Sequence, residues 1–358
     1  MPGTYPLWTP SIERKTASHL TRFAGFVAQN AGVSFDDYPA FHKWSVDNIE
    51  QFWGLAADFL AIKWQTKPER TLAGPAEGML GVNWFPKGTL SYTSNMLSGP
   101  DDLGIKIISI IEGIDQPIRM TGGSIYQAVA RCAAHLTRLG VQPGDRVAGV
   151  LPNTPEAIIA MLGTSSIGAI WSSCSPDFGQ EGILDRFGQI TPKVLFVTTS
   201  YIYNGKTIDC RPTITAVLQK LPSVARCIAV DPIQSGMTVA NTIPWAQFLA
   251  EASGAEKNFK PLATSFDHPL YILFSSGTTG KPKCIVHSVG GSLLQHKKEL
   301  LLHSDIGPGS RLLYFTTCGW MMWNWMASGL STGASLVLFE GSIIRDNCKV
   351  LWRTLEEQ

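Results

Sequence analysis

The feature that most constrains the fold is a regular alternation of short apolar runs and helical stretches between residues 124 and 230. Strands are predicted at 146–151, 169–173, 194–198 and 226–230, and helices at 124–139, from 154, near 180–190 and near 212–220. Because a helical crossover brings consecutive strands back in the same direction, such strands pair in parallel and need helices on both faces. The sequence therefore predicts an α/β fold with a mostly parallel sheet flanked by helices.

Local signals set the ends of these helices. Ser124 and Gln127 have the spacing of a capping box, and Gly140 supplies a natural helix end. Thr154 followed by Pro155 places a capping residue directly before proline at the first helical position. These signals predict where the crossovers start and stop.

The chain on either side of the alternation is expected to differ. Toward the N-terminus, helical spacing predicts helices at 20–27, ending at Gly32, and at 49–60, whereas 68–123 sustains no period and is predicted to be irregular. Toward the C-terminus we predict strands 271–274, 284–287, 312–316 and 336–339 with helices 293–302, 320–330 and 348–355. We therefore predict an N-terminal module and connector at 1–110 and a main domain at 111–358.

Composition excludes several classes of protein. The net charge of +1 among 358 residues gives no electrostatic case for binding nucleic acid or an anionic membrane. The seven cysteines include no C-x-x-C pair, the histidines show no metal spacing, and residues 1–6 lack the features of a secretory signal. The stretch 157–178, uncharged apart from Asp177, is interrupted by glycines and serines, which favours a buried helix and strand over a membrane span. We expect a globular protein of the reducing cytoplasm.

One loop contains residue types that indicate a chemical function. Residues 275–283 read SSGTTGKPK and lie between two predicted strands. Glycines let backbone N–H groups approach an anion, hydroxyl groups donate further hydrogen bonds, and lysine adds a compact charge, so the loop suits phosphate. A flexible surface turn is the alternative on composition alone. A Walker A loop is excluded because Ser275 lies five residues before Gly280 and Pro282 follows Lys281.

The same residues resemble a known family. The segment 271–283, YILFSSGTTGKPK, is similar to the signature loop of the acyl-adenylate-forming superfamily, although Cys284 replaces the glycine that most members have. Within that superfamily, the stretches 167–179 (IGAIWSSCSPDFG) and 316–326 (TTCGWMMWNWM) resemble the acetoacetyl-CoA synthetases. Residues 44–53 and Trp84-Phe85-Pro86 resemble the N-terminal module of acetyl-CoA-synthetase-like ligases.

The resemblance implies a two-step ligase that uses ATP, Mg²⁺ and coenzyme A as small-molecule partners. Acetoacetate would be activated to acetoacetyl-AMP and then transferred to the thiol of coenzyme A. The resemblance assigns the phosphates of ATP to Ser275, Ser276, Gly277, Thr278, Thr279, Gly280, Lys281 and Lys283. It assigns the acyl pocket to Trp320, Met321, Met322 and Trp323, for which an ordinary buried helix is the alternative. Lys206 is a candidate for contacting coenzyme A, with a solvated turn residue as the alternative.

Segments that the family carries beyond this point do not occur in the sequence. The family's Thr-Glu segment, its ribose-binding aspartate and its C-terminal catalytic lysine are missing, and the last predicted helix has no terminating residue. We therefore expect a C-terminally incomplete enzyme domain that is inactive on its own. The alternatives are a non-catalytic remnant and a ligase for another short acid such as acetate.

Overall fold

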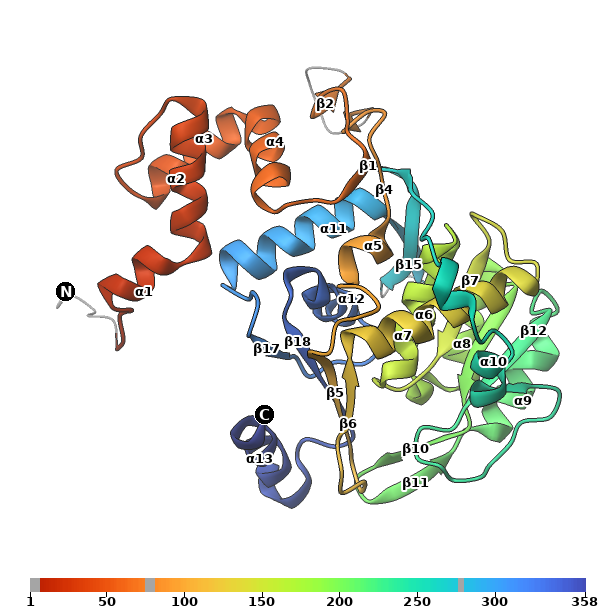
Figure 1. The fold of residues 1–358 in the computed structure, drawn as a ribbon. Helices are drawn as coiled ribbons and strands as arrows, with labels where there is room; N and C mark the ends of the chain where they lie inside the picture. The colour runs from red at the N-terminus through yellow and green to blue at the C-terminus, as the bar shows by residue number, and fades with distance from the viewer. Residues whose placement is uncertain (1–6, 75–80, 276–279) are drawn as a thin grey trace.

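Two mixed sheets form the centre of the molecule (Figure 1). The computed structural model describes residues 7–74, 81–275 and 280–358. The first sheet has the strand order β13-β12-β9-β7-β8-β15-β16, and the second has the order β17-β18-β5-β6. Each sheet is parallel except for one antiparallel edge strand, β16 in the first and β6 in the second. The predicted α/β fold with mostly parallel sheets flanked by helices is therefore confirmed.

The first sheet contains the four strands of the predicted alternation, each within one residue of its predicted bounds. Its strands are β7 (Arg146–Val150), β8 (Ile170–Cys174), β9 (Val194–Thr198), β12 (Arg226–Val230), β13 (Ile243–Pro244), β15 (Pro269–Ser275) and β16 (Lys283–Ser288). Every residue of β8 and β9 is buried, as expected when helices cover both faces of a parallel sheet. A short hairpin, β10 (Ser200–Tyr203) and β11 (Lys206–Asp209), extends from the end of β9.

The second sheet assembles segments that are far apart in the sequence. Its strands are β5 (Ile105–Ile111), β6 (Ile118–Thr121), β17 (Arg311–Leu313) and β18 (Ser335–Glu340). Strand β5 runs parallel to β18 and pairs on its other side with β6. The prediction of irregular structure over 68–123 was therefore wrong at β5 and β6. No residue of β5 is exposed, so β5 lacks the alternating pattern of a half-exposed strand, and β6 has only four residues, too few to show a period.

Helices cover both sheets. They are α5 (Tyr92–Met96), α6 (Gly122–Arg138), α7 (Pro155–Ser166), α8 (Gly179–Ile190), α9 (Arg211–Lys220), α10 (Trp245–Ala250), α11 (Val289–Lys298), α12 (Met321–Ala327) and α13 (Lys349–Glu357). The predicted capping box at Ser124 was wrong, because α6 begins earlier and its N-cap is Thr121, whose hydroxyl accepts from the Ser124 N–H. Ser124 instead occupies the third helical position.

Helix α7 explains the long uncharged stretch of the sequence. All of its residues except Glu156 are buried, and it packs against α6 and α5 before the chain enters β8. A helix that is apolar all round is either buried in a large protein or embedded in lipid, and here protein covers it. No helix in the described part of the chain combines the length and apolar character that a membrane crossing requires.

Four helices open the described chain and are separated from the sheets by a connector (Figure 1). They are α1 (Ile12–Ala17), α2 (His19–Ala31), α3 (Tyr38–Asp47) and α4 (Ile49–Phe59). Helices α2 and α4 were predicted, including the end of α2 at Gly32, whose φ is +67°. Helices α1 and α3 were not predicted. The fully buried Phe23 packs its ring against Phe41, Phe52 and Phe59, which joins three of these helices.

The connector is tied to the main body by short strands. They are β1 (Trp64–Thr66), β2 (Leu72–Ala73), β3 (Asn83–Trp84), β4 (Thr89–Leu90) and β14 (Thr264–Ser265). Strand β4 pairs with β1 on one side and with β14 on the other, and β14 lies just before β15. The connector is thus anchored next to the strand that leads into the glycine-rich loop.

Candidate active site

The glycine-rich loop joins the last two strands of the first sheet. Strand β15 ends at Ser275 and β16 begins at Lys283, and these two residues face each other in the antiparallel register. The predicted hairpin across the loop is therefore confirmed. Gly280 has a φ of +141°, a conformation that favours glycine. The predicted phosphate ligands Ser276, Gly277, Thr278 and Thr279 lie outside the described residues.

Helix α8 braces the base of this loop. The Gln189 amide donates to the Pro282 carbonyl at 2.9 Å, and the Cys284 thiol lies 3.8 Å from the Gln189 amide oxygen. The Lys281 ammonium lies 4.0 Å from the Asp185 carboxylate and is largely exposed. Lys283 is also exposed, so both lysines of the loop are accessible to a ligand in solvent.

An aromatic and cationic cluster lies beside the loop. Phe178 follows β8, and the Arg186 guanidinium from α8 lies 4.6 Å from its ring centre and 5.8 Å from that of Phe274 in β15. The ring of Phe178 also packs so tightly on Gly319 that a Cβ there would lie 2.5 Å from the Phe178 ring. The region that follows β17 is therefore held against the end of β8.

The four residues predicted to form the acyl pocket lie at the start of α12 but differ in exposure. Trp320 and Met321 are 65% and 48% exposed, and Met322 is intermediate. Trp323 is completely buried, and its indole N–H donates to the Asn153 side-chain oxygen at 2.9 Å. The structure thus brings the four residues together, with three reaching the surface and one in the core. Their role in an acyl pocket remains a prediction.

Asn153 and Glu340 join the two sheets at this site, and the sequence analysis missed both. Asn153 follows β7, and its backbone N–H donates to the Glu340 carboxylate at the end of β18 at 2.6 Å. Its side chain also donates to the Phe339 carbonyl at 3.4 Å. Burial raises the pKa of the Glu340 carboxyl to about 7, and the nearby charge of Asp177 acts in the same direction. The only sequence signal was a polar residue near the end of each apolar run, three residues after β7 for Asn153 and at the last position of β18 for Glu340.

The thiols of Cys174 and Cys318 are poor candidates for a nucleophile. Burial raises the pKa of the Cys174 thiol to about 12 and that of Cys318 well above its usual range, so neither is a thiolate near neutral pH. The Cys318 thiol instead donates to the Pro152 carbonyl at 3.3 Å. The seven cysteines are unpaired. Among the described residues, no cluster of three His, Cys, Asp or Glu side chains could hold a metal ion.

Lys206, the candidate contact for coenzyme A, is exposed at the start of β11. It pairs with Tyr203 across the two-residue turn Asn204-Gly205. That turn is held by the buried carboxylate of Glu112, a residue the sequence analysis did not single out. Glu112 follows β5, and the apolar run before it carried no detectable period.

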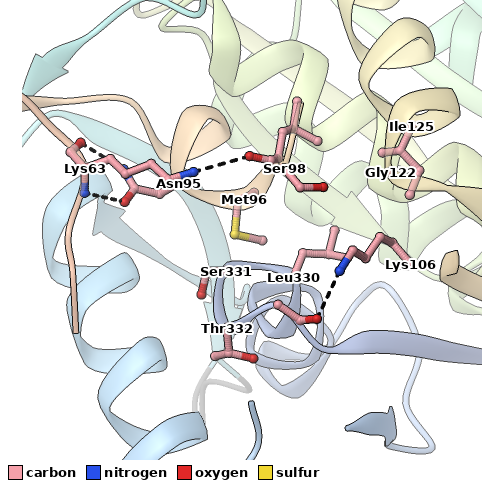
Figure 2. Close-up of a pocket in the computed structure, with 12 residues that line it drawn as sticks. Lys63, Asn95, Met96, Ser98, Lys106, Gly122, Ile125, Leu330, Ser331 and Thr332 are labelled. Carbon is pink, nitrogen blue, oxygen red and sulfur yellow. Dashed lines mark hydrogen bonds between the residues drawn. The ribbon is translucent and has the colours of Figure 1, made fainter. Parts of the chain in front are cut away.

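A separate pocket lies between the connector, the start of α6 and the segment after α12 (Figure 2). It has a volume of about 240 Å³, and Lys63 and Lys106 line it. These lysines donate to backbone carbonyls, Lys63 to Ser94 at 3.1 Å and Lys106 to Gly333 at 3.1 Å. The first N–H groups of α6 are also bonded to backbone carbonyls. We therefore interpret this pocket as a gap between packed elements rather than as an anion-binding site.

Comparison with known proteins identifies the family. A model described as AMP-binding enzyme matches residues 106–358. The chain belongs to the AMP-binding enzyme family. A second model, described as the acetyl-coenzyme A synthetase N-terminus, matches residues 38–96. The resemblance inferred from the loop and the N-terminal segment is therefore confirmed, while the predicted domain boundary at residue 110, which falls inside β5, remains a prediction.

Individual members of the AMP-binding enzyme family match nearly the whole chain. Acetoacetyl-coenzyme A synthetase of Rhizobium meliloti (strain 1021) is 44% identical over 96% of this chain and 52% of that protein. Acetoacetyl-CoA synthetase of Gallus gallus is 38% identical over 98% of this chain and 53% of that protein. The structure of acetoacetyl-CoA synthetase from Streptomyces lividans superposes with a TM-score of 0.91 at 38% identity, covering 99% of this chain and 54% of that one. The chain spans about half the length of these relatives.

Proposed function

We propose that the whole protein is an acetoacetate–CoA ligase, which forms acetoacetyl-CoA through an acetoacetyl-AMP intermediate. The main support for this proposal is the loop Ser275–Lys283. Its glycines, hydroxyl groups and lysines suit phosphate, and it connects the two strands of a hairpin that α8 contacts through Gln189. The similarity to acetoacetyl-CoA synthetases over almost the entire chain supports the choice of acid. The unpaired cysteines support a cytoplasmic location.

In the first step, a carboxylate oxygen of acetoacetate attacks the α-phosphorus of ATP, and the bond to pyrophosphate breaks. We assign Ser275, Lys281 and Lys283, together with Ser276 and residues 277–280 of the same loop, to the β- and γ-phosphates. Their lysine charges would offset the negative charge that builds up on the departing pyrophosphate. Magnesium would be bound mainly by the phosphates and water, since the described residues offer no carboxylate cluster for it.

In the second step, the thiol sulfur of coenzyme A attacks the acyl carbon, the thiol loses its proton, and the bond to AMP breaks. We assign the acyl group to the surface of Trp320, Met321 and Met322, where bulky side chains would limit the length of the acid. Lys206 is assigned to a phosphate of coenzyme A. Its exposed position at the start of β11 is compatible with a large polar ligand.

The test has two arms. In the first, equilibrium dialysis measures binding of ATP to the 358-residue chain and to Lys283→Ala, with Lys257→Ala, an exposed lysine on another face, as the control. We expect only Lys283→Ala to weaken binding. In the second, the Rhizobium meliloti relative is given acetoacetate, acetate or propionate with ATP and coenzyme A, and AMP release is followed.

Each arm has a result that counts against the proposal. Equal ATP affinity of wild type and Lys283→Ala would contradict the loop assignment. A preference for acetate over acetoacetate would contradict the choice of acid. We expect the 358-residue chain alone to bind ATP without forming acetoacetyl-CoA, which is the behaviour of a non-catalytic nucleotide-binding fragment. Acetoacetate-dependent AMP release by this chain would contradict that expectation.

A further inference from the structure

Glu112 is a buried carboxylate that joins three separate segments. Its Oε2 accepts from the backbone N–H groups of Asn204 at 3.0 Å and Ser342 at 2.8 Å. Its Oε1 accepts from the Gly205 N–H at 2.5 Å and from the Arg345 guanidinium at 2.7 Å. A carboxylate offers about four lone-pair positions, so these four donors use its full capacity. The side chain is only 2% exposed.

Two of the four donors belong to the tip of the β10–β11 hairpin. Asn204 and Gly205 have φ values of +51° and +75°, the conformation of a type I′ turn, for which Asn-Gly is the preferred sequence. The N–H groups of both turn residues point to Glu112, which lies just past the end of β5. In Figure 1 the hairpin lies beside the β5–β6 end of the second sheet, as these bonds require.

The carboxylate therefore attaches the hairpin that follows β9 to the end of β5 in the second sheet. Within the described part of the chain, β10 and β11 pair with each other and with no further strand, so contacts such as those of Glu112 position the tip of the hairpin. The hydrogen bonds favour the ionised form and hold the pKa of Glu112 below its ordinary value, although burial alone would raise it. The attachment is thus present at neutral pH.

We propose that Glu112 is the positioning residue for Lys206: by fixing the Asn204-Gly205 turn, it holds the next residue of the chain where its ammonium group meets a phosphate of coenzyme A. Lys206 begins β11 directly after Gly205, and its backbone is paired with Tyr203. Fixing both turn residues therefore fixes the origin of the Lys206 side chain. The inference rests on the proposed function, since it takes coenzyme A as the ligand of Lys206.

The test compares Glu112→Gln, Glu112→Asp and Lys206→Ala in the 358-residue chain. In Glu112→Gln, an amide NH₂ replaces one oxygen and faces two N–H donors, so two bonds are lost without a change of size. Glu112→Asp keeps the charge and should partly restore the wild-type behaviour, and it remains informative if the glutamine variant folds poorly. The matched control is Glu256→Gln, because Glu256 also accepts from an arginine, Arg131 of α6, and from the backbone N–H of Gly254.

Two readouts separate a positioning role from a merely structural one. Hydrogen exchange of peptides covering 200–209 should become at least about tenfold faster in Glu112→Gln, since bonds to a charged group are lost. Equilibrium dialysis should show that Glu112→Gln and Lys206→Ala each weaken binding of coenzyme A and of adenosine 3′,5′-bisphosphate by roughly tenfold. Pantetheine, which has no phosphate, should bind all variants equally. Glu256→Gln should match the wild type in both readouts.

The outcomes distinguish the inference from the proposed function. Faster exchange of the hairpin with unchanged affinity for coenzyme A would overturn the positioning role and leave the ligase proposal standing. Unchanged exchange in Glu112→Gln would overturn it as well, because the turn would then be fixed by other contacts. Failure of the wild type to bind either phosphate-bearing probe would reject coenzyme A as the ligand of Lys206, and the inference with it.

Discussion

Replacement of Trp323 by phenylalanine tests whether this residue belongs to the core or to the acyl pocket. Its side chain is completely buried, and its indole N–H donates to Asn153 at 2.9 Å. Phenylalanine would fill most of the space but could not donate. The side-chain amide of Asn153 also donates to the Phe339 carbonyl, so it cannot turn to a new partner without losing that bond.

The expected loss of stability has two parts. An acceptor left unsatisfied in the interior costs about 1–3 kcal/mol. The smaller ring leaves roughly 40 Å³ unfilled, which at about 24 cal/mol per Å³ adds about 1 kcal/mol. We therefore expect Trp323→Phe to lower the free energy of unfolding by about 2–4 kcal/mol. Met321→Ala is the matched control, because Met321 is 48% exposed and its truncation should cost less than about 1 kcal/mol.

Urea denaturation followed by far-UV circular dichroism measures both changes, with the slope expected to stay constant while the midpoint moves. Saturation-transfer NMR with acetoacetate provides the second readout, in which Met321→Ala should weaken the signal and Trp323→Phe should not. The reasoning would be refuted if Trp323→Phe were as stable as the wild type and lost acetoacetate binding. Trp323 would then act as a wall of the pocket.

Three further predictions concern Lys283 in the loop, the buried carboxyl of Glu340 and the contact between Gly319 and Phe178. Lys283→Ala in the 358-residue chain should weaken binding of pyrophosphate by roughly tenfold, measured by calorimetry, because a charge is lost beside the phosphates; equal affinity would speak against the site. The pKa of the Glu340 carboxyl is about 7 in the folded protein, against 4.5 in the unfolded chain. The folded state therefore binds the proton more tightly and is favoured most at low pH. The free energy of unfolding should fall by about 3 kcal/mol between a pH below 4.5 and a pH above 7. Glu340→Gln should flatten this pH dependence in urea titrations at several pH values, because the amide does not titrate and its oxygen can still accept from Asn153. A pH dependence as steep as that of the wild type would show that Glu340 is not its cause. Gly319→Ala should lower the thermal midpoint of unfolding and cost about 1–3 kcal/mol of stability, because the new Cβ would lie 2.5 Å from the ring of Phe178. A midpoint equal to that of the wild type would show that the Phe178 ring can move aside without loss of stability.

Local sequence signals were sufficient for most elements of the main domain. Strands β9 and β12 have the predicted bounds, and α2 ends at the predicted glycine. The hairpin around the loop was also predicted, because two apolar runs flank a segment rich in glycine and hydroxyl groups. Periodicity, caps and turn residues act over a few positions, so they can be read without knowing the fold.

Contacts across long separations could not be predicted in this way. The N–H of Ser342 reaches Glu112 across 230 positions, and that of Asn153 reaches Glu340 across 187. None of these residues belongs to a motif. Each matters because two sheets bring the ends of distant strands together, and a buried carboxylate there must find donors wherever the fold supplies them.

The sequence by itself determined the class of fold, the position of the glycine-rich loop between two strands and the family. Those properties depend on patterns of neighbouring residues. Only the tertiary structure decided that β15 joins the first sheet beside β8, whereas β5 lies between β18 and β6 in the second. The packing of whole layers decides which strands pair. An apolar strand that is buried on both faces could form its backbone hydrogen bonds with many other strands, so its own sequence does not select the partner. For the same reason, only the structure revealed that Glu112 holds the hairpin that carries Lys206.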